Sequence, residues 1–481
     1  MKQISLYVLT LIVVGAAIFA LLDLGSTLPR PAGAATEVQQ GVAATTPVPE
    51  ASSSSLLDDL RANLGSPLTR LFLQLLVIIA AARVAGSAAV VLGLPAVVGE
   101  MAAGILLGPS LFGSVAPGAF AFVFPADSLG ALRLLSQIGV CLFMFAVGME
   151  LNVRHVRSKA RAAIAVSNAS ILVPFLFGVA LAYLLYTDLA GSSATFTGFA
   201  LFMGISMSIT AFPVLARILQ ERGMTHTALG STAITCAAVD DVTAWSILAF
   251  VVAIVRSSSL GGAAMTLLLS MAFIVIMTLG VRRALPSWLG RDALTREEPS
   301  SATLATVVCV VLAAALSTEI IGIHALFGAF LAGAVMPDAE GFRERINARV
   351  ERFSSVLLLP LFFAYTGLRT QVGLLGDLDG WLLCLIIIAV ATLGKLGASA
   401  VAARVAGMGW RESLQLGALM NTRGLMELIA LNLGYDLGIL SPRIFTMLVI
   451  MALVTTMLTG PLLTLFGHRQ PVAAGSEASR A

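Results

Sequence analysis

The chain has 481 residues, of which 58% are hydrophobic and 11% are charged, and its mean hydropathy is +0.96. Soluble domains carry about 25% charged residues, so this composition excludes a soluble enzyme or ligand-binding domain and predicts an all-α polytopic membrane protein. The formal net charge is only +3, and no basic patch is interleaved with aromatic residues, so nucleic acid is not an expected partner.

The N-terminal part of the chain precedes the predicted membrane domain. An apolar stretch at 4–24 follows Lys2, a pattern typical of a signal peptide or a signal anchor. Residues 1–28 are therefore expected to form one of these two, and the sequence leaves both open. Residues 29–66 are rich in Pro, Ala, Ser and Thr, which predicts a disordered linker. After the last apolar segment, residues 468–481 are expected to form a short tail.

A membrane domain is expected over residues 67–467, with about thirteen transmembrane helices judged by length and flanking charge. The predicted segments are 68–91, 95–113, 129–150, 160–187, 196–219, 226–255, 262–283, 302–318, 322–336, 353–370, 380–405, 411–435 and 443–467. Several of them are short or are interrupted by Gly or Pro, which indicates broken helices.

Lys and Arg follow the odd-numbered segments. The basic stretches lie at 154–161, 217–222, 282–296, 343–352 and 404–411, whereas the opposite loops carry little of this charge. Under the positive-inside rule these stretches and the C-terminus face the cytoplasm. The chain is therefore expected to be an integral protein of a bacterial inner (plasma) membrane.

An internal repeat is visible in two pairs of segments. Gly-Glu-Met-Ala-Ala-Gly at 99–104 is echoed by Gly-Ala-Phe-Leu-Ala-Gly at 328–333, and Leu-Phe-Met-Phe-Ala-Val-Gly-Met-Glu at 142–150 by Leu-Phe-Phe-Ala-Tyr-Thr-Gly-Leu-Arg at 361–369. In both pairs, the second copy follows the first by the same odd number of membrane segments. The two copies therefore cross the membrane in opposite directions. Chance similarity between apolar helices explains one echo more easily than two at the same offset. An inverted-topology repeat is the prediction.

The fifth segment contains an interruption, Ser-Met-Ser-Ile-Thr-Ala-Phe-Pro at 206–213. Pro213 lacks a backbone N–H and bends or breaks a helix. Ser208 and Thr210 are expected either to satisfy the freed backbone groups or to face an ion. Ordinary polar contacts between helices are the alternative.

The twelfth segment contains a second interruption at the same offset in the repeat. Asn421, Thr422 and Gly424 are poor helix formers, and Arg423 and Glu427 are charges at membrane depth. The two interruptions predict two crossing discontinuous helices, whose half-helix ends meet near the centre of the bilayer.

Asp240 and Asp241 lie in the middle of the apolar run 227–255. A charge at bilayer depth costs about 2.5 kcal/mol or more, so intramembrane acids are functional candidates by default. A carboxylate pair held by hydrogen bonds is the alternative. Consecutive helical residues point roughly 100° apart, so the two acids cannot face one partner.

Lys395 lies deep in the eleventh segment, from which it would have to reach far to snorkel to an interface; snorkelling is the alternative to an intramembrane partner acid. We expect one aspartate to pair with Lys395 while the other faces an aqueous cavity. Glu100 and Glu427 are candidate accessory acids that could instead pair with an arginine or lie near an interface. A carboxylate in a partly dry cavity holds a proton or a monovalent cation, not both, so an exchange follows if the cavity opens to alternate sides.

Other chemistries are less consistent with the sequence. Four cysteines and four histidines are scattered without metal-ligand spacing, so no resident metal and no cofactor is expected. A membrane aspartyl protease needs two acids that share a proton, which neighbours on one helix cannot do. A cation channel or gated efflux path without proton coupling stays open as an alternative to exchange.

Three motifs together resemble the monovalent cation:proton antiporter-2 family, most nearly its Kef-like and plant cation/proton exchanger branch. They are the runs at 206–217, 237–245 and 421–428, and residues 99–113 are similar to the same family's second helix. The resemblance covers 68–467. It implies a secondary active transporter rather than an enzyme, exchanging K⁺ or Na⁺ for protons in a lipid membrane. Kef-type proteins also carry a nucleotide-binding regulatory domain, which this chain is not expected to contain.

The resemblance also implies an arrangement of domains and roles. The sodium/proton antiporter fold divides into a dimer domain, a core domain and a linker helix, and homodimers are expected. By position these are about 68–150 with 302–370, about 160–255 with 380–467, and 262–283. Asp241 is implied to be the shared cation and proton carrier, and Asp240 to pair with Lys395, a pattern associated with two protons exchanged for one cation.

Overall fold

The structure is a computed structural model. It describes residues 63, 66–150, 160–191, 194–225, 227–256, 260–290, 294–296, 298–339 and 341–467. The predicted signal segment, nearly all of the predicted linker and the C-terminal tail therefore lie outside the described residues. So do residues 154–159 of the first basic stretch, 154–161.

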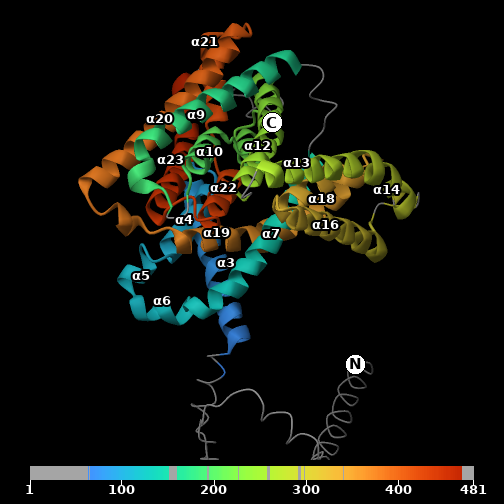
Figure 1. Cartoon of the computed structure of the whole chain (residues 1–481), viewed down its shortest axis with the longest axis horizontal. Coiled ribbons are helices and arrows are strands. Elements are labelled where there is room, and N and C mark those ends of the chain that lie inside the picture. Colours follow the sequence, from blue (N-terminus) through green and yellow to red (C-terminus); the bar gives the residue numbers. More distant parts are fainter. Residues whose placement is uncertain are drawn as a thin grey trace, which may run out of the picture. The chain divides into compact units, whose positions relative to one another are not determined.

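The described chain is almost entirely helical (Figure 1). Its main helices are α3 (Pro67–Val91), α4 (Ala96–Leu107), α5 (Phe112–Val115), α6 (Pro117–Val123), α7 (Leu129–Glu150), α9 (Ala160–Leu189), α10 (Phe196–Ser208), α11 (Phe212–Glu221), α12 (Ala228–Arg256), α13 (Leu260–Val275), α14 (Arg282–Leu289), α16 (Ser301–Ile321), α17 (Ala325–Ala334), α18 (Phe342–Phe353), α19 (Leu359–Arg369), α20 (Leu378–Val405), α21 (Trp410–Met420), α22 (Leu425–Asp436) and α23 (Pro442–Phe466).

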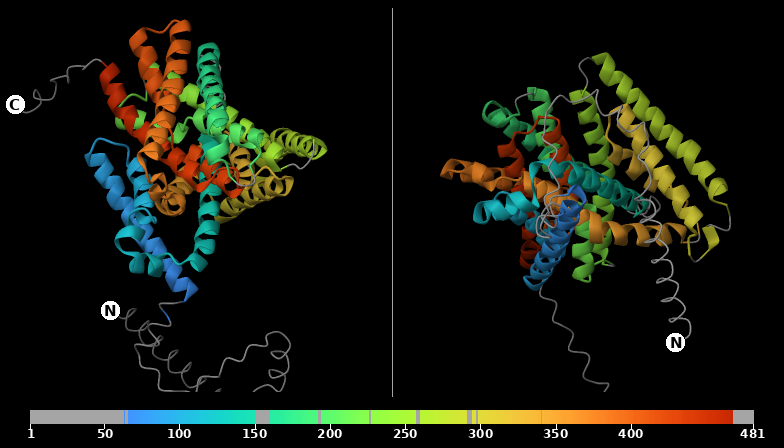
Figure 2. Two further views of the ribbon diagram at one scale, coloured as in Figure 1. Left: turned by 60° about the vertical axis from the view of Figure 1, so that its left-hand side comes forward. Right: turned by 90° about the horizontal axis from the view of Figure 1, so that it is seen from below.

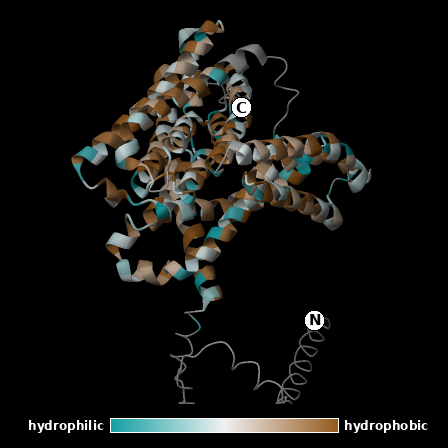
Figure 3. Cartoon of the chain, in the orientation of Figure 1, coloured by the Kyte–Doolittle hydropathy of each residue, from teal (hydrophilic) through white to brown (hydrophobic). Residues whose placement is uncertain are grey.

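Within the described residues, 11 helices are long and apolar enough to cross a membrane. Hydrophobic residues predominate along these helices (Figure 3). The predicted segments 322–336 and 411–435 correspond to shorter pieces, namely α17 and the pair α21 and α22. The chain is thus an integral membrane protein, and the count of thirteen helices stays a prediction.

Local sequence explains where several helices begin. Ser66, Ser300 and Ser441 each accept a hydrogen bond from the backbone N–H three residues later, and Thr195 and Asp377 do the same. Such N-caps satisfy one of the four N–H groups that a helix leaves without a partner. The beginnings of α3, α10, α16, α20 and α23 are therefore set by their own sequences.

The segment before the tenth predicted span differs from expectation. The arginines at 343–352 were expected in a loop, but they lie on α18, an amphipathic helix. A single π-helical turn, Ser354–Leu358, joins α18 to α19 without a break. One helical rod therefore runs from the basic stretch into the membrane span Val356–Leu375.

The helices pack in two groups. In one, α9 contacts α10, α12 and α20, while α21 and α23 pack on α20. In the other, α4 packs between α3 and α19, and α7 packs on α17, α18 and α19. α13 and α14 lie alongside α16 and away from α9 and α20 in each view (Figures 1 and 2).

The repeated glycines lie where helix backbones come closest. A Cβ on Gly104 would lie 2.2 Å from the carbonyl oxygen of Phe363, and one on Gly367 would lie 2.0 Å from that of Gly104. In the second copy a Cβ on Gly333 would lie 2.1 Å from the carbonyl oxygen of Phe145. Thus α4 packs on α19 through glycines in the same way as α17 packs on α7. The two copies of the inverted repeat share this close packing of small residues.

Gly333→Ala should destabilise the protein by about 1–3 kcal/mol, because the added methyl group forces the backbones of α17 and α7 apart. Gly397→Ala is the matched control: Gly397 is helical in α20 and has nothing within 4 Å of a built Cβ. Its helix should gain up to about 1 kcal/mol. Thermal unfolding of the purified variants in detergent measures both, and equal melting temperatures would contradict the close-packing argument.

Candidate functional site

The first discontinuous helix is interrupted between α10 and α11. α10 ends at Ser208, and residues 209–211 are not helical. Pro213 lies in the first turn of α11, where its missing N–H costs nothing. The hydroxyl of Ser208 donates to the carbonyl of Gly204 at 2.7 Å, so this side chain serves its own helix end. The last carbonyls of α10 need donors from elsewhere.

The second discontinuous helix is interrupted between α21 and α22, at residues 421–424. The two interruptions cross in direct contact. The backbone N–H of Ala211 donates to the carbonyl of Thr422 at 2.9 Å, and the hydroxyl oxygen of Thr210 lies 3.1 Å from the carbonyl oxygen of Met420. Neither interrupted segment can therefore shift at the crossing without breaking hydrogen bonds to the other.

Two buried cations cap the broken end of α10. Arg423 donates to the carbonyls of Ser206 at 2.5 Å and of Met207 at 2.7 Å. Lys395 donates to the carbonyl of Ser208. A helix C-terminus carries partial negative charge, so positive side chains are favourable there. Arg423 and Lys395 thus replace the hydrogen bonds that the interruption removed.

Asp240 is the most extensively hydrogen-bonded acid of the site. Its carboxylate accepts from Lys395 at 3.1 Å, from Thr210 at 2.7 Å, and from Ser167 and Ser170 of α9 at 2.5 and 3.2 Å. All of these side chains are fully buried. Four donors occupy this carboxylate, so a cation would have to displace one of them.

The sequence did not point to Ser167 and Ser170. Their three-residue spacing puts both on one face of α9, and Ser170 also accepts from Lys395 through its backbone carbonyl at 3.0 Å. Serines in apolar helices commonly bond to their own backbone, so the spacing alone is a weak signal.

Asp241 has a different environment from its neighbour. It is 1% exposed, and neither carboxylate oxygen has a hydrogen-bond partner among the described residues. The carboxylate lies close to the backbone N–H of Phe212, at the start of α11, without reaching hydrogen-bond geometry. An unpaired buried charge is costly, so this group needs a proton or a cation as its partner.

A cavity of about 1000 Å³ approaches this acid from the side of the basic stretches. Arg217 and Glu100 line it, and it reaches Pro213 in the first turn of α11. Asp241 is not among the lining residues, so the expectation that the second aspartate faces an aqueous cavity is not met in this conformation. The first turn of α11 separates the acid from the cavity.

The remaining candidate residues divide between the cavity and the buried crossing. Glu100 lines the cavity, whereas Glu427 is buried and pairs with Arg423 at 3.4 Å. Thr422 contacts the hydroxyl of Thr459 on α23 at 3.3 Å. The amide of Asn421 is fully buried and has no hydrogen-bond partner among the described residues. Within the described part of the chain, no three His, Cys, Asp or Glu side chains gather as a metal site.

A second polar cluster, which the sequence did not indicate, joins the two groups of helices. Asp436 of α22 accepts from Arg369 of α19 at 2.7 Å and from Arg133 of α7 at 3.3 Å. Arg369 also stacks over Tyr365 and Tyr435, at 4.3 and 5.1 Å from the ring centroids. We call Arg133, Arg369 and Asp436 the latch.

The latch and the large cavity lie toward opposite ends of α7. Arg133 is near the start of the helix, and Glu150, which lines the cavity, is its last residue. A separation of seventeen residues corresponds to about 26 Å. His324 lines a small space beside Asp436. The ion pairs of the latch are formed by two arginines and one aspartate.

Comparison with known proteins agrees with the geometry. Residues 75–467 match the family model described as sodium/hydrogen exchanger, transmembrane. The Na(+)/H(+) antiporter NhaS4 of Synechocystis is 44% identical over 391 residues, which cover 81% of this chain and 95% of that protein. The K(+)/H(+) antiporter 1 of Saccharomyces cerevisiae is 32% identical, over 83% of this chain and 46% of its own length.

Among solved structures, the sodium proton antiporter MjNhaP1 from Methanocaldococcus jannaschii at pH 8 superposes with a TM-score of 0.60. The match covers 84% of this chain and all of that chain at 15% identity. The likeness shows a shared fold, in agreement with the predicted fold class.

Lys395→Met should destabilise the protein by about 3–5 kcal/mol, because it leaves Asp240 charged and buried without its cation. Asp240→Asn combined with Lys395→Met should recover part of this loss, because both charges are gone. Arg443→Met is the control, since it removes only an exposed ion pair with Asp377 and should cost less than about 1 kcal/mol. Thermal unfolding in detergent distinguishes them, and a single variant as stable as the wild type would refute a structural role for the buried pair.

Proposed function

Since this chain belongs to the sodium/hydrogen exchanger family, whose members are transporters and not enzymes, we propose that it exchanges K⁺ or Na⁺ for protons by alternating access. The proposal makes Asp241 the shared carrier. The observation that carries it is the contrast between neighbours: Asp240 has four donors, whereas the oxygens of Asp241 have none. Of these two acids, only Asp241 has carboxylate oxygens that are unoccupied and can bind a transported ion.

Coupling follows from the burial of Asp241. The site cannot hold this carboxylate as an isolated charge, so a proton leaves only when a cation replaces it, and the reverse. The amide oxygen of Asn421 is a second unpaired acceptor in the buried crossing, and we include it among the cation's ligands. Lys395 stays with Asp240, which keeps a second negative charge from attracting the cation.

Under alternating access, the site is open to one side of the membrane and closed to the other, and these two sides correspond to the two ends of α7. The cavity is open toward the basic stretches, which we place in the cytoplasm with the C-terminus, and the latch closes the other side. In this proposal α9–α12 and α20–α23 form the moving core domain of a bacterial inner-membrane protein. α3–α7 and α16–α19 form the dimer domain of a homodimer, and α13 and α14 link the two.

The alternative is a channel on the same fold. A channel passes ions without exchanging protons, and its open state requires a path through both ends. The closed latch and the buried carrier favour exchange, since a carrier exposes its site to one side at a time. Proton coupling is therefore the property to test.

Asp241→Asn should abolish exchange, because an amide can neither release a proton nor neutralise a cation. Wild type and variant are reconstituted in liposomes with an inward proton gradient and a pH-sensitive dye, then offered Na⁺, K⁺, Li⁺ and Rb⁺ in turn. Dequenching with one or two of these ions, lost in the variant, identifies antiport and its substrate together.

The control for that experiment is Asp379→Asn, the same chemical change at an exposed position near the start of α20. It should keep full exchange. Full exchange in Asp241→Asn would contradict the assignment of the carrier. Membrane current under applied voltage without dequenching by any cation would support the channel instead.

Asp436→Asn should weaken the latch and raise the share of molecules open on its side. A hydrogen bond to a charged group contributes about 1.5–3 kcal/mol, so labelling of a cysteine behind the latch should accelerate about tenfold or more. Ser136→Cys is suitable, since Ser136 lines the small space beside Asp436 and is buried. The rate of reaction with a membrane-impermeant maleimide, in a background with the four native cysteines replaced, measures the opening.

Asp127→Asn is the matched control for the latch. It removes an exposed ion pair with Arg70, 3.2 Å long, which joins neighbouring elements of one helix group. It should leave the labelling rate of the cysteine at position 136 unchanged. Equal rates in the Asp436 and Asp127 variants would show that the latch does not hold this side closed.

A further inference from the structure

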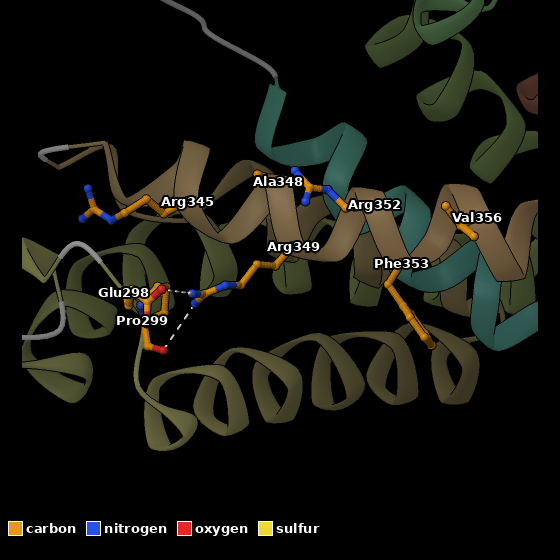
Figure 4. A pocket seen from close by; sticks show the side chains of 8 residues that line it. All are labelled: Glu298, Pro299, Arg345, Ala348, Arg349, Arg352, Phe353 and Val356. Atoms are coloured by element: carbon orange, nitrogen blue, oxygen red, sulfur yellow. Dashed lines mark hydrogen bonds and ion pairs between the residues drawn. The ribbon is translucent and has the colours of Figure 1, made fainter.

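A groove of about 640 Å³ lies beside α18 and is distinct from the carrier site (Figure 4). Its volume is in the range of small-molecule sites. The residues that matter for its chemistry are Glu298, Arg345, Arg349, Arg352, Phe353 and Val356. The exchange mechanism uses none of them.

The groove is positively charged. Arg345, Arg349 and Arg352 lie on one face of α18, within about 60° of each other at 100° per residue. Among the described lining residues the acid is Glu298, whose side chain is 89% exposed and lies 3.8 Å from Arg349. The three arginines outnumber it, so the charge of these lining residues is positive.

The arginines differ in how far they are engaged. Arg345 donates to the carbonyl of Leu294 at 2.6 Å, and Arg349 donates to that of Pro299 at 3.3 Å. For Arg352 the described residues provide neither a hydrogen bond nor an ion pair, and its side chain is exposed. This guanidinium is available to a ligand.

The floor of the groove is apolar. Phe353 is 55% exposed and Val356 is 44% exposed, and Val356 begins the membrane span Val356–Leu375. Figure 4 shows Phe353 and Arg349 pointing to the same side of α18. Basic side chains at the end of a membrane span, with apolar side chains one turn deeper, match the headgroup and the first acyl carbons of an anionic phospholipid.

The groove shares a wall with the large cavity. Ala348, Arg352 and Val356 line both, so α18 separates one space from the other. A positive charge at this wall opposes a cation that enters the cavity. A phosphate on the groove side would offset it.

We propose that the groove binds the phosphate headgroup of an anionic phospholipid, and that this headgroup neutralises Arg352 at the edge of the cation route. The effect on the cation route rests on the proposed exchange, whereas the binding of the lipid does not. Bound lipid therefore lowers the cation concentration needed for half-maximal exchange. A free phosphate ester has the same polar chemistry but lacks the tails that Phe353 and Val356 would contact.

The binding experiment uses the full-length protein in detergent and native mass spectrometry with phosphatidylglycerol or phosphatidylcholine. Arg349→Gln combined with Arg352→Gln should weaken phosphatidylglycerol binding about 30-fold, the equivalent of about 2 kcal/mol for two arginines near an anionic headgroup. Arg282→Gln combined with Arg283→Gln removes the same charge from exposed positions at the start of α14 and should keep the binding.

Three outcomes would overturn the lipid site: equal binding of the two lipids, equal losses in both double variants, or displacement of phosphatidylglycerol by soluble glycerol phosphate at millimolar concentration. The last outcome would indicate a general anion site. None of these depends on transport, so failure here is distinct from failure of the exchange proposal.

The effect on the cation route is measured in liposomes of either lipid, as the cation concentration that gives half-maximal dequenching. Wild type and the control pair Arg282→Gln/Arg283→Gln should require several-fold less cation in phosphatidylglycerol. Arg352→Gln should require little cation in both lipids. A variant that keeps the full lipid dependence of the wild type would refute the role of Arg352, because the membrane's own surface potential acts equally on all three proteins.

Discussion

The organisation of the site depends on the interruption of α10 in the middle of the membrane domain. A helix end leaves carbonyl groups without partners, and apolar surroundings offer them none. Arg423 and Lys395 supply the missing donors to the carbonyls of residues 206–208. These two cations in turn need anions, and Glu427 and Asp240 provide them. The break in α10 thus accounts for two ion pairs, Arg423 with Glu427 and Lys395 with Asp240. Asp241 belongs to neither pair.

Four of the charged side chains at the site have structural partners, and one, Asp241, is the candidate functional charge. Asp240 belongs to a closed network of three hydroxyl groups and an ammonium group, in which every contact is buried. Asp241 differs by one position in sequence and about 100° around α12, yet it has no hydrogen bond among the described residues. A carboxylate whose oxygens already have hydrogen-bond donors gains little from binding an ion. Asp241 lacks such donors, so we propose it as the carrier.

Much of the fold was predictable because its signals are local. The third segment, predicted at 129–150, coincides with α7, and the interruptions around Pro213 and at 421–424 follow from residues that are poor in helices. The contact between Lys395 and one aspartate was also expected, because two buried charges of opposite sign need each other. Its role in transport stays a prediction. Ser167, Ser170 and Asp436 were not predicted, since only the packing of distant helices brings them to their partners. The burial of Asp241 beside the start of α11 likewise depends on how separate helices pack.

The relative strength of the contacts indicates where the protein can move. The crossing of the interrupted helices is held by buried hydrogen bonds and buried ion pairs, and breaking one such pair costs about 3–5 kcal/mol. The two helix groups are joined differently: by the partly exposed latch at one end, and across a cavity of about 1000 Å³ at the other. Partly exposed ion pairs contribute less than buried ones, so this interface yields before the crossing does. In the proposed exchange, the site therefore moves as one rigid unit against α4, α7 and α19. Asp241, the proposed carrier, then changes sides while the contacts that hold its neighbours stay intact.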